Sequence, residues 1–111
     1  MLIHQKISQK LQKKKKIKTI VNYFSTKTAF EILSNYGKCD VIYGANVFNH
    51  VDDNIDFLNG ASLILKKKGV LILEVPDLKS LIEEVGFDTI YHEHRHYYSE
   101  KSLNKLSLIH I

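Results

Sequence analysis

Residues 87–99 read FDTIYHEHRHYYS, and the side chains of this stretch have the chemistry of a proton-transfer site. Histidine titrates near neutral pH, so an imidazole such as that of His94 can accept a proton and return it. The neighbouring carboxylate of Glu93 can orient an imidazole and stabilise its protonated form. The phenol of Tyr91 can donate a hydrogen bond to an oxyanion that develops during a reaction. The stretch therefore suits proton transfer, provided that these side chains converge.

A zinc site is a second interpretation of the same stretch. His92, His94 and His96 alternate, so in an extended segment all three side chains point to one side. Three imidazoles can bind zinc and leave its fourth position open to water. Ligands from one short segment are usually joined by a ligand from a second element, however, and the chain contains no cysteine-rich motif. We therefore expect no metal site. Spacing alone leaves open whether the stretch is catalytic or a solvated polar loop.

Four residues outside this stretch are candidates for a binding or catalytic role. His50 follows an apolar run in GANVFNHVDD, where it can act as a catalyst or simply begin a helix and pack. Asn46 in the same run can hydrogen-bond a ligand or cap its own turn. Phe24 ends an earlier apolar run and is expected in the core. Glu74 ends a later run, where it either meets a backbone amide or reaches a ligand.

Three apolar runs predict the strands that carry these residues. KIKTIVNYF (16–24) is rich in β-branched and aromatic residues. CDVIYGANVF (39–48) is nearly continuous in its apolar character, as expected of a buried parallel strand. GVLILEVP (69–76) is stopped by Pro76, which lacks the backbone donor that a sheet interior needs.

Helices are predicted between and after the strands, and capping residues or closing glycines mark most of them. The predicted ranges are 25–37 (Ser25 or Thr26, then Gly37), 53–69 (Asp52 or Asp53, then Gly69), 78–86 and 99–108 (Ser99). Strands that alternate with helices indicate right-handed βαβ units and a parallel sheet. Such sheets bind ligands beyond the carboxyl ends of their strands, so a site should include GANVFNH and EVPDL.

Composition restricts the class of protein. A chain of 111 residues, 44% hydrophobic and 25% charged, is typical of one small soluble domain. Its longest apolar run is far shorter than the ~20 residues that a membrane span requires. Lysines interrupt the first segment, which therefore does not resemble a signal peptide. The single cysteine, Cys39, fits a reducing compartment, and we expect a cytoplasmic protein with no membrane partner.

The basic residues do not form the pattern of a nucleic-acid-binding protein. The formal net charge is +4, and lysines cluster at 13–16 and 66–68. Nucleic-acid binding favours arginines that grip phosphates and aromatic rings that stack on bases. Here Arg95 is the single arginine, and aromatic residues do not interrupt either lysine cluster. We therefore interpret the clusters as solvated ends of helices and expect no nucleic-acid partner.

Three segments occur in an order and spacing that resemble one enzyme family. They are KIKTIVNYFSTKTA, CDVIYGANVFNHVDDNIDFLNGASLILKKKGVLILEVPDL and FDTIYHEHRHYYSEKSL. Together they resemble the S-adenosylmethionine-dependent sugar C-methyltransferases, which methylate a carbon of a nucleotide-linked keto-deoxysugar. The resemblance covers about residues 16–106 and is most specific where Asn-Val-x-x-His is joined to Phe-Asp-x-Ile-Tyr-His-Glu-His.

The resemblance implies a fold and a set of roles. The fold would be α/β, a partial Rossmann-like class I methyltransferase sheet of about three parallel strands with flanking helices. His50, Tyr91, Glu93 and His94 would face the sugar and the donor methyl group. His94 or Tyr91 would remove a proton next to the ketone and stabilise the enolate, with Glu93 orienting His94. His50 would be an alternative base or a substrate hydrogen-bond donor.

The resemblance also implies which residues would bind the donor. Asn46 and its neighbours would lie by the methionine part of S-adenosylmethionine, and the region of Phe24 by its adenine. His92 and His96 have no role carried over from the family. On this basis the resemblance favours proton transfer over the loop interpretation.

Departures from the family pattern point to a fragment. Family members begin with a zinc-binding cysteine-rich segment and a glycine-rich donor-binding turn, and this chain contains neither, nor any G-x-G. We divide it into a basic N-terminal helix (1–15), a partial methyltransferase domain (16–106) and an unmatched tail (107–111). We expect little or no activity from the chain alone, and the sequence leaves open whether a complementing polypeptide exists. The alternative from another class is a small non-catalytic binding or interaction module.

Overall fold

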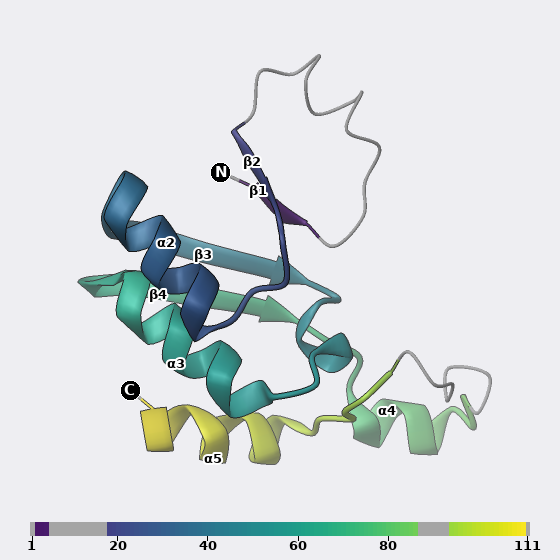
Figure 1. The fold of residues 1–111 in the computed structure, drawn as a ribbon. Coiled ribbons are helices and arrows are strands. Elements are labelled where there is room, and N and C mark those ends of the chain that lie inside the picture. The colour runs from purple at the N-terminus through teal and green to yellow at the C-terminus, as the bar shows by residue number, and fades with distance from the viewer. Residues whose placement is uncertain (1, 5–17, 87–93, 111) are drawn as a thin grey trace.

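The computed structural model describes residues 2–4, 18–86 and 94–110 of the chain. In chain order the elements are β1 (Leu2–His4), β2 (Thr19–Val21), α2 (Thr26–Tyr36), β3 (Cys39–Ala45), the short 3₁₀-helix η1 (Phe48–His50), α3 (Asn54–Ile64), β4 (Leu65–Glu74), α4 (Leu78–Glu83) and α5 (Glu100–His110). Figure 1 shows β3 and β4 side by side, with α2 and α3 packed together over one face of this pair. The predicted α/β class is confirmed.

The strands form two parallel pairs. In the larger pair, β3 runs beside β4, with Val41 opposite Val70 and Ala45 opposite Glu74. In the smaller pair, β2 runs beside β1. All three predicted strands are therefore present, but β2 is paired with residues 2–4 and not with β3. Residues 2–4 form a strand within the range 1–15 that we expected to be helical. The rest of that range lies outside the described residues.

Helix α2 begins and ends where its capping residues predict. The Ser25 hydroxyl accepts a hydrogen bond from the backbone N–H of Thr28 at 3.3 Å, which satisfies a donor in the first turn. Gly37 follows the last turn with φ of 78°, a conformation that costs glycine little because it has no Cβ. Between these ends Ala29 and Ile32 are buried on the face that meets the sheet.

Helix α3 is shorter than predicted, and this is a correction. Asp53 is its N-cap, as one of the two alternatives, but the helix ends at Ile64 and not near Gly69. Leu65 already pairs with Cys39, and the register then jumps to Val41 opposite Val70. The lysines at 66–68 lie in this irregular start of β4 and are not the solvated end of a helix. Strand pairing with a distant segment outweighs the local helical pattern here.

Close contacts join the two helices at their N-terminal ends. A Cβ on Gly60 would lie 3.1 Å from the carbonyl oxygen of Ser25, so glycine permits this approach. The Asp56 carboxylate accepts hydrogen bonds from the backbone N–H of Thr26 at 3.0 Å and from the Thr26 hydroxyl. These bonds tie the start of α2 to α3. They also fix the loop 22–25, which ends at the cavity described below.

Two apolar clusters form the core on the helix-covered side of the sheet. One contains Ala29, Ile32 and Ile64, between α2, α3 and the sheet. The other contains Phe48, Phe57, Leu58 and Tyr98, with Leu103 and Leu106 of α5 packed against it. Among the helices in the described ranges, none is long and apolar enough to cross a membrane.

Candidate functional site

A cavity of about 560 Å³ lies at the carboxyl end of β3 and beside the end of β2. It is lined by residues 22–25, 42–47, 50–53, 56 and 57. This is the edge of a parallel sheet where ligands are expected to bind. Three of the predicted site residues, Phe24, Asn46 and His50, line it.

His50 is placed by the short helix η1. Phe48 at the start of η1 is fully buried, and its ring lies 5.2 Å from that of Phe57 and 4.8 Å from that of Tyr98. The backbone N–H of His50 donates to the carbonyl of Val47 at 2.9 Å. Since Phe48 anchors the turn in the core, His50 at the opposite end of the turn is directed to the cavity.

His94 lies next to His50. The centroids of the two imidazole rings are 4.8 Å apart, and the rings meet edge to face at 66°. The segment that carries His94 is attached to η1 because the carbonyl of Asn49 accepts hydrogen bonds from the backbone N–H groups of Arg95 and His96, at 2.8 and 3.1 Å. Two candidates that are far apart in the sequence thus lie in contact. Tyr91 and Glu93 lie outside the described residues.

Asn46 follows β3 in a left-handed conformation, with φ of 52°. Asparagine tolerates this conformation better than most residues. Its backbone N–H donates to the carbonyl of Glu74 at 2.7 Å, which continues the β3–β4 pairing one residue past the strand. The bond leaves the Asn46 side chain exposed at the cavity.

Phe24 lines the cavity and also packs in the core, as its position at the end of a strand suggested. Its ring meets that of Phe57 edge to face, with centroids 5.0 Å apart. One side of the ring is therefore fixed by the core, and the loop around it forms the wall of the cavity. An aromatic ring such as that of Phe24 can pack against an aromatic base.

Tyr43 is a cavity residue that sequence reasoning missed. Its hydroxyl donates a hydrogen bond to the Glu74 carboxylate at 2.7 Å. This bond and the negative charge of Glu74 raise the pKa of the Tyr43 phenol. Glu74 thus has two roles at the end of β4, since its carbonyl also binds Asn46. No local signal could identify the pair, because only the β3–β4 register brings the two side chains together.

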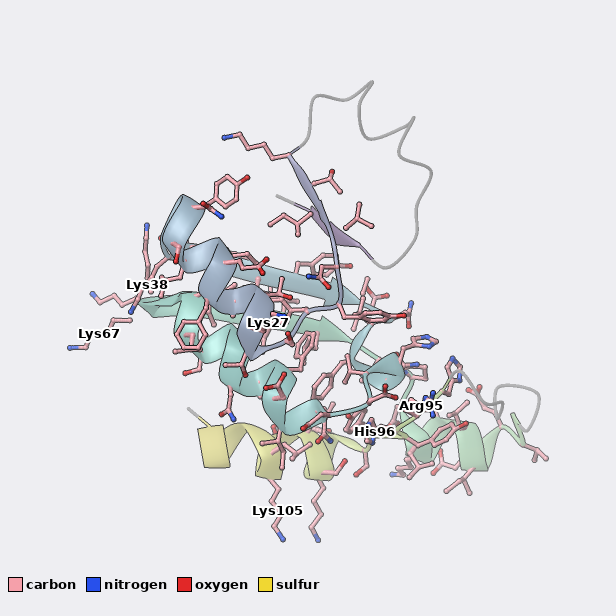
Figure 2. The ribbon with its side chains drawn as sticks, viewed as in Figure 1. Lys27, Lys38, Lys67, Arg95, His96 and Lys105 are labelled. Atoms are coloured by element: carbon pink, nitrogen blue, oxygen red, sulfur yellow. The ribbon has the colours of Figure 1, made fainter. Side chains whose placement is uncertain are left out.

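Asp52 and Arg95 form a second pair that the sequence did not reveal. Arg95 Nε lies 3.2 Å from Asp52 Oδ1, and His96 Nε2 lies 3.3 Å from the carbonyl oxygen of Asp52. Figure 2 shows Arg95 and His96 at one end of the molecule, opposite Lys38 and Lys67. Asp52 lines the cavity, so this pair lies at its rim.

The zinc interpretation depended partly on His92, which lies outside the described residues, as does Glu93. Within the described ranges, no group of three or more histidine, cysteine, aspartate or glutamate side chains is arranged to bind a metal ion. His50 and His94 meet as a pair of rings.

A family model described as a methyltransferase domain matches residues 4–107 of the chain. The chain belongs to this methyltransferase domain family. Proteins of the family generally bind S-adenosylmethionine. The chain is also 38% identical over 87 residues to the C-methyltransferase NovU of Streptomyces niveus. The match covers 78% of this chain and 21% of that relative, so the chain spans about a fifth of the relative's length.

The cavity of this methyltransferase domain fits a donor in part. Its volume lies within the range of about 300–1,000 Å³ that is usual for small-molecule sites. Phe24 offers an aromatic wall, and Asn46 offers an amide at the end of a strand. The chain has no glycine-rich turn, which in the resembling enzymes binds the methionine part of the donor. The residues present therefore fit only part of such a donor.

Proposed function

We propose that these residues form the acceptor-side part of a C-methyltransferase that methylates a carbon of a nucleotide-linked keto-deoxysugar. The observation that carries the proposal is the contact between His50 and His94, whose rings are 4.8 Å apart, beside the cavity at the carboxyl end of β3. Membership of the methyltransferase domain family and similarity to a C-methyltransferase support it.

The reaction begins with the removal of a proton from the carbon next to the ketone. A histidine is suited to this step because it can take the proton near neutral pH. We assign the base to His94 or to its neighbour His50. Tyr91 stabilises the enolate by donating a hydrogen bond, and Glu93 orients His94. S-adenosylmethionine, when bound, supplies the methyl group that the enolate carbon receives.

Asn46 and Phe24 bind the donor in this proposal. The Asn46 amide hydrogen-bonds the methionine part, and the wall formed around Phe24 contacts the adenine. Both residues line the cavity, and each is fixed by a bond or ring contact that leaves part of it exposed to the cavity. Because the reaction needs both reactants positioned together, the donor side must also be complete.

We further propose that the 111 residues alone have little or no transferase activity, because they lack the glycine-rich part of the donor site. A single cysteine is consistent with a cytoplasmic location for this enzyme. Methyl transfer by the purified chain, clearly above that of its His94→Ala variant, would contradict the expected inactivity.

Proton abstraction can be tested separately from methyl transfer. In D₂O, a working base should exchange the hydrogen next to the ketone of a nucleotide-linked keto-deoxysugar for deuterium, without any donor. We expect exchange with the wild-type chain and a drop of about 10²-fold or more in His94→Ala. His96→Ala is the matched control, because it removes an imidazole of the same segment that has no assigned role. Equal exchange in all three proteins would rule out the proposed chemistry.

The alternative function, a non-catalytic interaction module, is favoured by one feature. Val41, Tyr43, Val70 and Ile72 are all about half exposed or more, on the face of the β3–β4 sheet away from the helices. Exposed apolar patches often mark binding surfaces. The deuterium-exchange measurement separates the two functions, because a non-catalytic module predicts no exchange that depends on His94.

A further inference from the structure

Arg95, the single arginine of the chain, lies directly beside the candidate base. Its backbone N–H is bonded to the carbonyl of Asn49, and the preceding residue is His94, whose ring contacts that of His50. Its side chain reaches Asp52, which lines the cavity. A permanent cation is therefore fixed at the rim of the site through its backbone.

The ion pair between Arg95 and Asp52 is of a kind that is easily exchanged. It joins Nε to one carboxylate oxygen at 3.2 Å, and the side chains are 59% and 82% exposed. Exposed pairs of this kind contribute little to stability. A guanidinium has five N–H donors in a planar fork, which matches two phosphate or carboxylate oxygens at once. An anion that presents two oxygens to the guanidinium can therefore replace Asp52 as its partner.

The charged residues that line the cavity are acidic, whereas Arg95 at its rim is basic. Among the described residues no lysine lines the cavity, whereas Asp52, Asp53 and Asp56 all do. Asp53 accepts the backbone N–H of Asp56 as the cap of α3, and Asp56 is bonded to Thr26. Of these three carboxylates, that of Asp52 is the one that meets a cation in the described part of the chain. An anionic ligand that approached this rim would be repelled unless Arg95 received it.

We propose that Arg95 binds the diphosphate of the nucleotide-linked acceptor, exchanging its pair with Asp52 for the phosphate oxygens. This inference rests on the proposed function, because it takes a nucleoside diphosphate as the substrate's carrier group. The backbone bonds of Arg95 and His96 to Asn49 keep the segment in place while the guanidinium turns. Phosphate held by Arg95 then brings the attached sugar to His94 and His50.

The two partners of the pair give variants with opposite expected effects. Calorimetric titration with uridine diphosphate measures its dissociation constant for each variant. We expect about tenfold weaker binding to Arg95→Gln, because a charge-assisted hydrogen-bonded contact is lost. Asp52→Asn should bind about threefold more tightly, because it frees the guanidinium and removes a repelling charge. Arg95→Lys should retain part of the affinity. Lys66→Gln, which breaks the exposed Lys66–Asp40 pair at the other end of the sheet, is the control that should bind like the wild type.

Other outcomes overturn the proposal. If Arg95→Gln and Asp52→Asn both weaken binding, the pair is structural and does not exchange. Unchanged binding by Arg95→Gln, or no binding of uridine diphosphate to any of the proteins, excludes a diphosphate site at Arg95. Deuterium exchange that depends on His94 would in those cases leave the proposed chemistry intact. Conversely, Arg95-dependent nucleotide binding without such exchange would exclude the chemistry and retain the diphosphate site.

Discussion

The two faces of the β3–β4 sheet differ sharply, although the same two strands form both. On one face Leu71 and Leu73 lie against the core cluster of Phe48 and Phe57. On the other face Tyr43 and Ile72 are 62% and 46% exposed, and the described residues place no helix over them.

The strands themselves are apolar on both faces. A nearly continuous apolar run is typical of a parallel sheet that is covered on both sides. We predicted 39–48 as such a buried strand, but the burial in the structure alternates along it. The difference shows that the composition of the strands suits a second layer that the described residues do not supply.

The largest expected effect is on the covered face. Phe48→Ala should lower the free energy of unfolding by about 3–5 kcal/mol, because it removes a fully buried ring and leaves a cavity under η1. Ile72→Ala on the open face should cost less than about 1 kcal/mol. Urea unfolding of both variants measures the contrast. Similar losses in the two variants would mean that the open face is covered in solution, for example by a second copy of the chain.

A smaller effect is expected where α2 and α3 touch. Gly60→Ala places a Cβ 3.1 Å from the Ser25 carbonyl oxygen, and crowding of this kind costs about 1–3 kcal/mol. The better helix propensity of alanine offsets about 1 kcal/mol of that loss. We expect a net destabilisation of about 1 kcal/mol in thermal or urea unfolding. Ser62→Ala, at an exposed position of the same helix, is the control and should not destabilise the protein.

The smallest expected effect is the pH dependence of stability, because the pKa of a tyrosine is raised for a different reason on each face. Burial raises the pKa of the Tyr98 phenol above its usual value of 10.0, whereas on the open face a bond to Glu74 raises that of Tyr43. Because the unfolded chain loses the Tyr98 proton first, this stabilisation is complete below about pH 10 and is lost as the pH rises. The stability difference between the wild type and Tyr98→Phe should therefore shrink as the pH rises above about 10.

The free energy of unfolding of both proteins is measured at a series of pH values. Because the two proteins contain the same lysines, the contribution of lysine titration cancels in the difference. A difference that stays constant would contradict the assigned role of burial. Glu74→Gln provides the companion measurement, because it should lower the pKa of Tyr43 in an ultraviolet titration and leave that of Tyr98 unchanged.

Local sequence was sufficient for the caps and the order of elements. Ser25, Asp53 and Ser99 accept hydrogen bonds from backbone groups three residues ahead, so their effect does not depend on the rest of the fold. Gly37 ends α2 for an equally local reason. The candidates Phe24, Asn46 and His50 could be proposed because they follow apolar runs, and parallel strands present their carboxyl ends at one edge.

Pairings between distant segments could not be read from the chain. The start of β4 was mistaken for helix because Cys39 pairs with Leu65, and no residue near Leu65 signals this partner. Tyr43 reaches Glu74, and Arg95 reaches Asp52, only after the strands and η1 are in place. The types of the reactive side chains and their local elements follow from short-range preferences along the chain. The contact of His94 with His50 follows from long-range packing around Phe48 and Asn49, which brings together segments that local forces cannot join.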